Sequence, residues 1–142
     1  MKRVISIMLA IILCLAISLP SMAAPKATPA PKFKVTISYS AKLVSNDHVG
    51  NSWVTNLQVG KSTIKKGKTL TLEVSSKDKI KIVCNATEND KIPDNGSAAI
   101  TIAAKDLKSG KNTYKTTVEV TENRGRYSGN TAEWAFTVTV KK

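Results

Sequence analysis

Apolar and polar side chains alternate along most of the chain after residue 31, with the period of two that is typical of β-strands. Gly, Pro and Asn turns divide this pattern into about eight runs, none with a convincing helical period. The predicted strands cover residues 33–44, 53–59, 62–65, 69–75, 79–86, 98–104, 112–122 and 131–140. Trp53 and Trp134 each follow a polar turn and lie near the start of a strand, and we expect both rings to pack in the core. The pattern predicts an all-β domain, a single antiparallel β-sandwich over residues 32–142.

The beginning of the chain departs from this pattern. Lys2 and Arg3 precede an apolar run over residues 4–19, and small residues follow it. These are the features of a cleaved secretory signal peptide. The alternative is a retained membrane anchor, but the run is shorter than the about 20 residues that a span needs. We therefore expect a signal peptide at residues 1–23, a Pro- and Ala-rich linker at residues 24–31, and a protein that is secreted or associated with the cell envelope.

Charge favours one kind of partner over others. The chain has 22 lysines and arginines and ten acidic residues, and loss of Lys2 and Arg3 with the signal peptide lowers the formal net charge from +12 to +10. Such a surface keeps a protein soluble and also attracts anions outside the cell. Lys79 and Lys81 project from one face of a predicted strand. We expect an anionic cell-wall polymer, an acidic lipid surface or an extracellular protein as partner, because no pattern typical of nucleic-acid binding is present.

A polar stretch between two predicted strands concentrates acidic side chains in this basic protein. It reads T-E-N-D-K-I-P-D-N-G-S, and Glu88, Asp90 and Asp94 fall within seven positions of one another. Pro93 and Gly96 lie in the same stretch, and we expect them to prevent a helix or a continuous strand there. The stretch is therefore predicted to be a rigid loop that carries carboxylates at one end of a sheet.

Strand order predicts that three long polar loops meet at one end of the sandwich. Every connection in an all-antiparallel sandwich reverses the chain, so connections after odd-numbered strands share an end. If residues 62–65 are a strand, these connections include residues 45–52, 87–97 and 123–130. This end would then be built by Asp47, Glu88, Asp90, Asp94, Arg124, Arg126 and Tyr127.

Carboxylates that gather at one end need neutralisation. Unpaired carboxylates about 5 Å apart repel by a few kcal/mol at an effective dielectric of about 20. Asx-turns and salt bridges are one solution, and Ca²⁺ held by oxygen ligands on loops is another. Asp47, Glu88, Asp90 and Asp94 are therefore candidate Ca²⁺ ligands.

Two local motifs resemble parts of C2 domains. The segment S-A-K-L-V-S-N-D-H-V-G-N-S-W resembles the opening of that family, in which a strand runs into an Asp-x-x-Gly loop and then an aromatic-led strand. The segment E-N-D-K-I-P-D-N-G is similar to its later Ca²⁺ loop. The resemblance implies an eight-stranded sandwich that binds Ca²⁺ and acidic lipid, with Asp47 and then Glu88, Asp90 and Asp94 as ligands. The second acid of the first loop is absent, and an immunoglobulin-like sandwich explains the strands equally well.

Little in the chain points to catalysis. His48 is the only histidine, and it directly follows Asp47, whereas the members of a catalytic triad converge from separate elements. Cys84 shares an apolar strand face with Ile80 and Ile82, which predicts a buried thiol. We predict a monomeric, non-catalytic binding or adhesion module of the cell envelope. A structural spacer without a ligand and a small secreted hydrolase are the alternatives.

Ca²⁺ at about 1 mM should raise the melting temperature, because a ligand that binds only the folded chain stabilises it, and Asp90→Asn should remove that rise. Thermal melting followed by circular dichroism, with Mg²⁺ as the control ion, measures the effect. A melting curve that Ca²⁺ does not move would eliminate the hypothesis.

Overall fold

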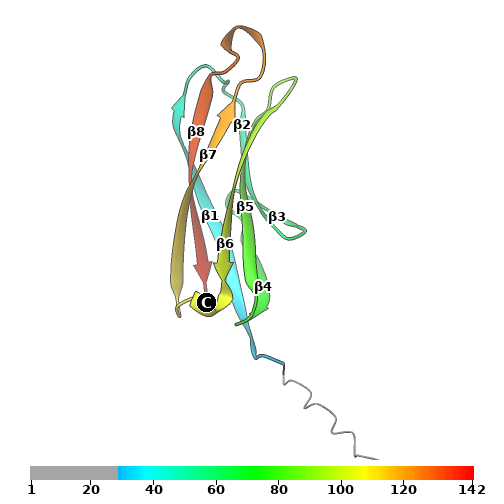
Figure 1. The fold of residues 1–142 in the computed structure, drawn as a ribbon, viewed down its shortest axis with the longest axis vertical. Coiled ribbons are helices and arrows are strands. Elements are labelled where there is room, and N and C mark those ends of the chain that lie inside the picture. The colour runs from blue at the N-terminus through cyan, green and yellow to red at the C-terminus, as the bar shows by residue number, and fades with distance from the viewer. Residues whose placement is uncertain (1–28) are drawn as a thin grey trace, which may run out of the picture.

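The computed structural model describes residues 29–142, which form eight strands and two single turns of 3-10 helix (Figure 1). The predicted signal peptide and most of the predicted linker lie outside the described residues. The strands are β1 (Lys32–Asn46), β2 (Trp53–Val59), β3 (Ser62–Lys65), β4 (Leu70–Ser75), β5 (Lys79–Glu88), β6 (Asp94–Ala103), β7 (Lys111–Thr121) and β8 (Thr131–Lys141). The 3-10 turns are η1 (Ala104–Asp106) and η2 (Gly125–Tyr127).

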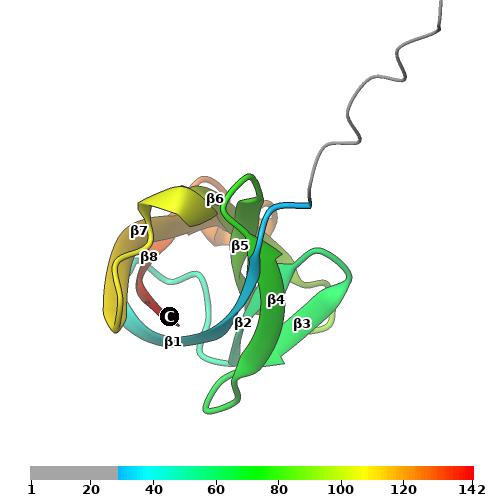
Figure 2. The ribbon, with the colours of Figure 1, turned by 90° about the horizontal axis from the view of Figure 1, so that it is seen from below.

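The strands form two antiparallel sheets of four strands each, in the orders β4-β1-β8-β7 and β3-β2-β5-β6. Seen end-on, the two sheets lie on opposite sides of the core (Figure 2). The predicted all-β sandwich of eight antiparallel strands is therefore confirmed. The short strand β3 has the predicted bounds, and this strand decides at which end each later loop emerges.

The core lies between the sheets and is built from alternate positions of the strands. In β5 the inward positions are Ile80, Ile82, Cys84 and Ala86, and all four are buried. Each fully buried Val, Leu, Ile or Phe side chain contributes about 1.5–3 kcal/mol. Burial also raises the pKa of the Cys84 thiol to about 11, because the apolar surroundings disfavour the thiolate. Cys84 is therefore a core residue, as its place in the strand pattern predicts.

The polar stretch over residues 87–97 differs from its prediction. β5 continues to Glu88 and β6 begins at Asp94, so only residues 89–93 form a loop. The expectation that Gly96 interrupts the strand is wrong, since Gly96 lies inside β6. The physical reason is close packing: a Cβ atom on Gly96 would overlap with the backbone carbonyl of Glu119 in β7. A residue without a side chain lets the two backbones approach each other across the side of the sandwich.

The opposite side of the sandwich stays open over part of its length. Strand β4 pairs with β1 only at residues 32–37, and β3 pairs with β2 only at residues 56–59. Within residues 29–142, the edges of β1 after Ile37 and of β2 before Asn56 therefore have no neighbouring strand. This difference between the two sides creates a groove along the open side.

The contact at Gly96 can be tested by adding one methyl group. Gly96→Ala should lower the free energy of unfolding by about 1–3 kcal/mol, because β6 must move away from β7 to accommodate the Cβ atom. Urea unfolding measures this change. Ser97→Ala, at the exposed next position of β6, is the matched control and should stay within about 0.5 kcal/mol. A Gly96→Ala protein as stable as the parent would refute the close approach.

Candidate functional site

Three polar loops meet at one end of the sandwich, here called the loop end (Figure 1). They are residues 47–52, 89–93 and 122–130. The backbone N–H of Asn89 donates to the carbonyl of Ser52 at 2.6 Å, which joins the second loop to the first. The guanidinium of Arg124 donates to the carbonyl of Ile92, which joins the third loop to the second. The prediction that the three polar loops share one end is therefore confirmed. The residues that build this end come from three distant parts of the sequence.

Two of the four candidate Ca²⁺ ligands are exposed and have partners on their own loops. The Asp47 carboxylate lies 2.8 Å from Nδ1 of His48, and both side chains are about two-thirds exposed, at 66% and 63%. The Asp90 carboxylate accepts a hydrogen bond of 2.7 Å from the backbone N–H of Ile92. The second contact is an Asx-turn, which holds the short loop between β5 and β6 in shape.

The other two candidate ligands are buried and lie opposite each other. Glu88 ends β5, Asp94 begins β6, and the two residues are paired in the antiparallel register. Their side chains are only 4% and 2% exposed. Glu88 accepts a hydrogen bond of 3.2 Å from the backbone N–H of Ser52, and Gly50 packs so closely on Glu88 that a Cβ atom would not fit. Glu88 therefore anchors the first loop to the end of the core.

Asp94 anchors the third loop in a similar way. Its Oδ1 atom accepts a hydrogen bond of 2.8 Å from the Asn123 amide and lies 3.8 Å from the Arg124 guanidinium. Its Oδ2 atom is buried without a hydrogen-bond partner. A buried carboxylate is costly unless it is paired, so these contacts make the position of residues 123 and 124 dependent on Asp94.

The structure thus assigns different contacts to the four carboxylates. Across residues 29–142, no three His, Cys, Asp or Glu side chains lie close enough together to hold a metal ion. The sequence predicts that the acids share an end, and they do, but side-chain burial separates an inner pair from two exposed loop residues. Ca²⁺ binding itself stays a prediction.

An exposed stack of side chains covers part of the loop end. The ring centroids of His48 and Tyr127 are 4.7 Å apart with an interplanar angle of 15°. The Arg126 guanidinium carbon lies 4.9 Å from the centre of the Tyr127 ring. Tyrosine and arginine are frequent in protein contact surfaces, because they combine an apolar face with polar groups. Arg126 and Tyr127 are predicted partner-binding residues; His48 joins them only through the tertiary contact between two loops.

The opposite end of the sandwich is basic, and we call it the lysine end. It consists of exposed residues of the strand ends and turns there, namely Lys32, Lys77, Lys79, Lys105, Lys108, Lys111, Lys141 and Lys142. Hydrogen bonds from Ala104 to the Asp78 carbonyl and between Gly110 and Lys142 hold these turns together. Asp78 and Asp106 are the acidic residues among them.

The predicted partner-binding residues therefore divide between two ends. Arg124, Arg126 and Tyr127 lie at the loop end, whereas Lys79 is the first residue of β5 and Lys81 follows two positions later. At about 3.3 Å per residue, the ten residues of β5 place Lys79 about 30 Å from Glu88. The two groups cannot contact the same small ligand.

No protein-family model matches the sequence, and no curated protein matches it. In the part of the chain that the structure describes, no helix is long and apolar enough to cross a membrane. The fold and the side-chain arrangement define an all-β sandwich whose two ends differ in charge.

The different roles of the acids can be tested by comparing two alanine variants. Asp94→Ala should lower the free energy of unfolding by about 1–3 kcal/mol, because it leaves the Asn123 amide without its buried acceptor. Asp90→Ala removes a single exposed turn contact and should cost about 0.5–1 kcal/mol. Urea unfolding of both variants under the same conditions makes the comparison. Equal losses would contradict the anchoring role of Asp94.

Proposed function

We propose that this chain is a secreted, non-catalytic binding module of the cell envelope that contacts an anionic cell-wall polymer through its lysine end. The observation that carries this proposal is the separation of charge between the two ends. Eight exposed lysines and two acids lie at the lysine end. The loop end has five acids, Asp47, Glu88, Asp90, Asp94 and Glu122, and three basic residues, Lys91, Arg124 and Arg126.

The lysines of the lysine end form no ion pairs within residues 29–142, although the Lys142 ammonium donates to the Leu107 carbonyl and lies over the Phe33 ring. The two ion pairs found within residues 29–142 are Asp47 with His48 and Asp94 with Arg124, both at the loop end. Neither pair includes a lysine. Unpaired, solvated ammonium groups that are grouped on one end produce a local positive potential, which draws in polyanions over a distance of about 8–10 Å in physiological salt.

The direction of the chain also supports a contact through the lysine end. Strand β1 begins at the lysine end, so residues 29–31 enter the domain there (Figure 1). A linker at this position would hold the lysine end toward whatever the N-terminal segment approaches. The loop end would then point away, with the Arg126–Tyr127–His48 stack available to a second partner such as an extracellular protein.

Side-chain environments favour binding over catalysis. His48 contacts Asp47 and stacks on Tyr127, and no hydroxyl or thiol within residues 29–142 is hydrogen-bonded to it. Cys84 is fully buried, and its thiol has a raised pKa. A nucleophilic thiol needs a lowered pKa, and that of Cys84 is raised.

A pair of charge-matched double variants tests the proposal. Lys79→Gln with Lys105→Gln removes two positive charges from the lysine end, and Lys91→Gln with Arg126→Gln removes two from the loop end. Each basic residue near an anionic surface contributes about 1 kcal/mol, so loss of two should weaken binding of the first variant to immobilised poly(glycerol phosphate) about 30-fold. The second variant should change binding less than about twofold.

The same assay includes outcomes that contradict the proposal. Binding of the parent protein should fall steeply as salt rises, because exposed charges are screened. Retention that ignores salt, or equal losses in the two double variants, would show that the lysine end is not the contact. Stronger retention on phosphatidylglycerol vesicles than on the polymer would assign the partner to lipid instead.

A further inference from the structure

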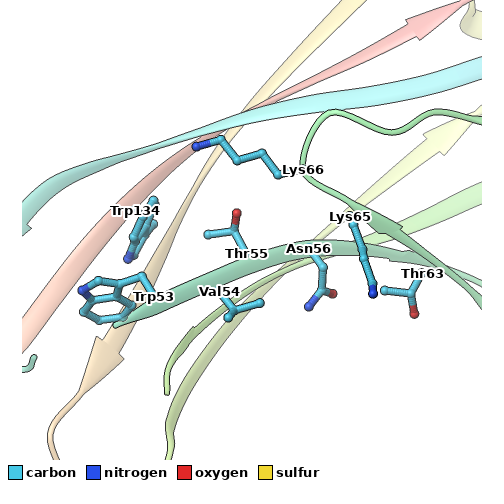
Figure 3. A pocket seen from close by; sticks show the side chains of 8 residues that line it. All are labelled: Trp53, Val54, Thr55, Asn56, Thr63, Lys65, Lys66 and Trp134. Carbon is cyan, nitrogen blue, oxygen red and sulfur yellow. The ribbon is translucent and has the colours of Figure 1, made fainter. Parts of the chain in front are cut away.

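The open side of the sandwich contains a groove that none of the proposed contacts uses (Figure 3). It exists because β3 ends at Lys65 and the chain then crosses between the sheets toward β4, which starts at Leu70. The groove has a volume of about 410 Å³. It is lined by Trp53, Val54, Thr55, Asn56, Thr63, Lys65, Lys66 and Trp134.

Both tryptophans of the protein lie at one end of this groove. The sequence pattern predicts that they pack in the core, and they are only partly buried. Their ring centroids are 5.5 Å apart, with an interplanar angle of 59°. The Trp53 indole N–H donates to the Gly50 carbonyl at 3.1 Å, which fixes this ring to the first loop. The rings thus form an aromatic wall with a defined orientation.

The indole nitrogen of Trp134 has no hydrogen-bond acceptor although it is buried. Figure 3 shows this nitrogen on the side of the ring that faces Trp53. Most buried donors in folded proteins have a partner, and a donor without one loses the hydrogen bond that it would make in water. This nitrogen has almost no exposed surface, so Trp134 offers a ligand in the groove its ring and not its N–H group.

The rest of the lining is polar and positively charged. Thr55 offers a hydroxyl group on the side of β2 where Lys66 and Trp134 lie, whereas the Asn56 and Thr63 side chains point to the other side of the strands (Figure 3). In Figure 3 the Lys66 side chain extends over the groove toward Trp134, while the Lys65 ammonium points away from it. Lys66 forms no ion pair with an acidic residue of the described chain. Its charge is therefore free for an anion that lies against the tryptophans.

The neighbouring strand edge is protected against an added strand. The exposed Lys42 lies on the uncovered part of β1, and the pairing of β1 with β8 shifts register between Leu43 and Ser45. Charged side chains and bulges on an edge strand prevent pairing with another chain. A compact ligand fits this side of the sandwich better than an extended peptide does.

We propose that this groove binds one sugar residue that carries an anionic group, either a carboxylate or a phosphate. The C–H face of a sugar ring packs on the indole face of a tryptophan, and one of its hydroxyl groups pairs with the Thr55 side chain. Lys66 pairs with the anionic group. The volume lies within the range of about 300–1,000 Å³ of small-molecule sites. This site is separate from the lysine end and does not depend on the polymer contact proposed above.

Intrinsic fluorescence provides a direct test, because the only two tryptophans of the protein line the groove. The parent protein is titrated with glucuronate, glucose 6-phosphate and glucose. Glucuronate or glucose 6-phosphate should change the emission saturably with a Kd of about 1–10 mM, and glucose should bind at least about fivefold more weakly. The preferred anionic sugar identifies the group as carboxylate or phosphate.

Two lysine variants determine whether Lys66 makes the ionic contact. Lys66→Ala should weaken binding of the preferred anionic sugar about tenfold, since a charge-assisted hydrogen bond is lost. Lys61→Ala removes a lysine from the neighbouring turn that does not line the groove, and it should leave the Kd unchanged. Both residues are exposed, so both variants should keep the melting temperature of the parent.

Several results would overturn the inference. No saturable change with either anionic sugar, glucose binding as tight as theirs, or an unchanged Kd in Lys66→Ala would each do so. An equal loss in the Lys79→Gln, Lys105→Gln double variant would show general charge attraction instead of a site. Failure of polymer binding in the earlier assay would leave the sugar titration unaffected, so the two proposals can fail separately.

Discussion

The approach of β6 to β7 at Gly96 shapes much of this sandwich. Two sheets with one apolar face each must stack to bury those faces, but stacking alone does not decide how the two sides close. On one side the missing side chain of Gly96 lets its backbone pack on the Glu119 carbonyl. On the other side β3 and β4 are short and cover only parts of β2 and β1. The sandwich is therefore narrow along one side and open along the other.

The open side and the two ends have different surfaces as a consequence. Antiparallel order sends alternate connections to opposite ends, so the polar loops that contain most of the clustered acids gather at one end. The lysine-rich turns, the start of β1 and the end of β8 gather at the other end. The groove lies between these ends, where partial coverage of the strand edges leaves two tryptophans accessible. The loop end, the lysine end and the groove thus each present different side chains, and all three are parts of the same eight-stranded sandwich.

The buried pair Glu88 and Asp94 links the loop end to the core. Two carboxylates that face each other at the edge of an apolar interior repel unless each has its own donors. Here the donors come from the first and the third loop, through Ser52 for Glu88 and through Asn123 for Asp94. The same contacts that satisfy the carboxylates therefore hold together loops that are distant in sequence. This one network of hydrogen bonds therefore determines both the stability of this end of the core and the position of the exposed Arg126–Tyr127–His48 stack.

The sequence by itself determined the features that depend on local periodicity and strand parity. Alternation of apolar and polar residues located all eight strands and placed Cys84 in the core, because side chains of a strand point to opposite faces in turn. Counting Ser62–Lys65 as a strand located the shared end of the loops. It also grouped Arg126 with Tyr127 there, since these residues are adjacent in the chain.

Tertiary structure alone decided which side chains meet and which are buried. The inclusion of Gly96 in β6 depends on a carbonyl 23 residues later in the chain, which no local pattern contains. The stacking of His48 on Tyr127, the burial of Glu88 and Asp94, and the meeting of Trp53 with Trp134 depend on contacts between separate loops and strands. Local periodicity specifies the face on which a residue lies, whereas its partners are set by how the two sheets are stacked and how far each edge strand extends.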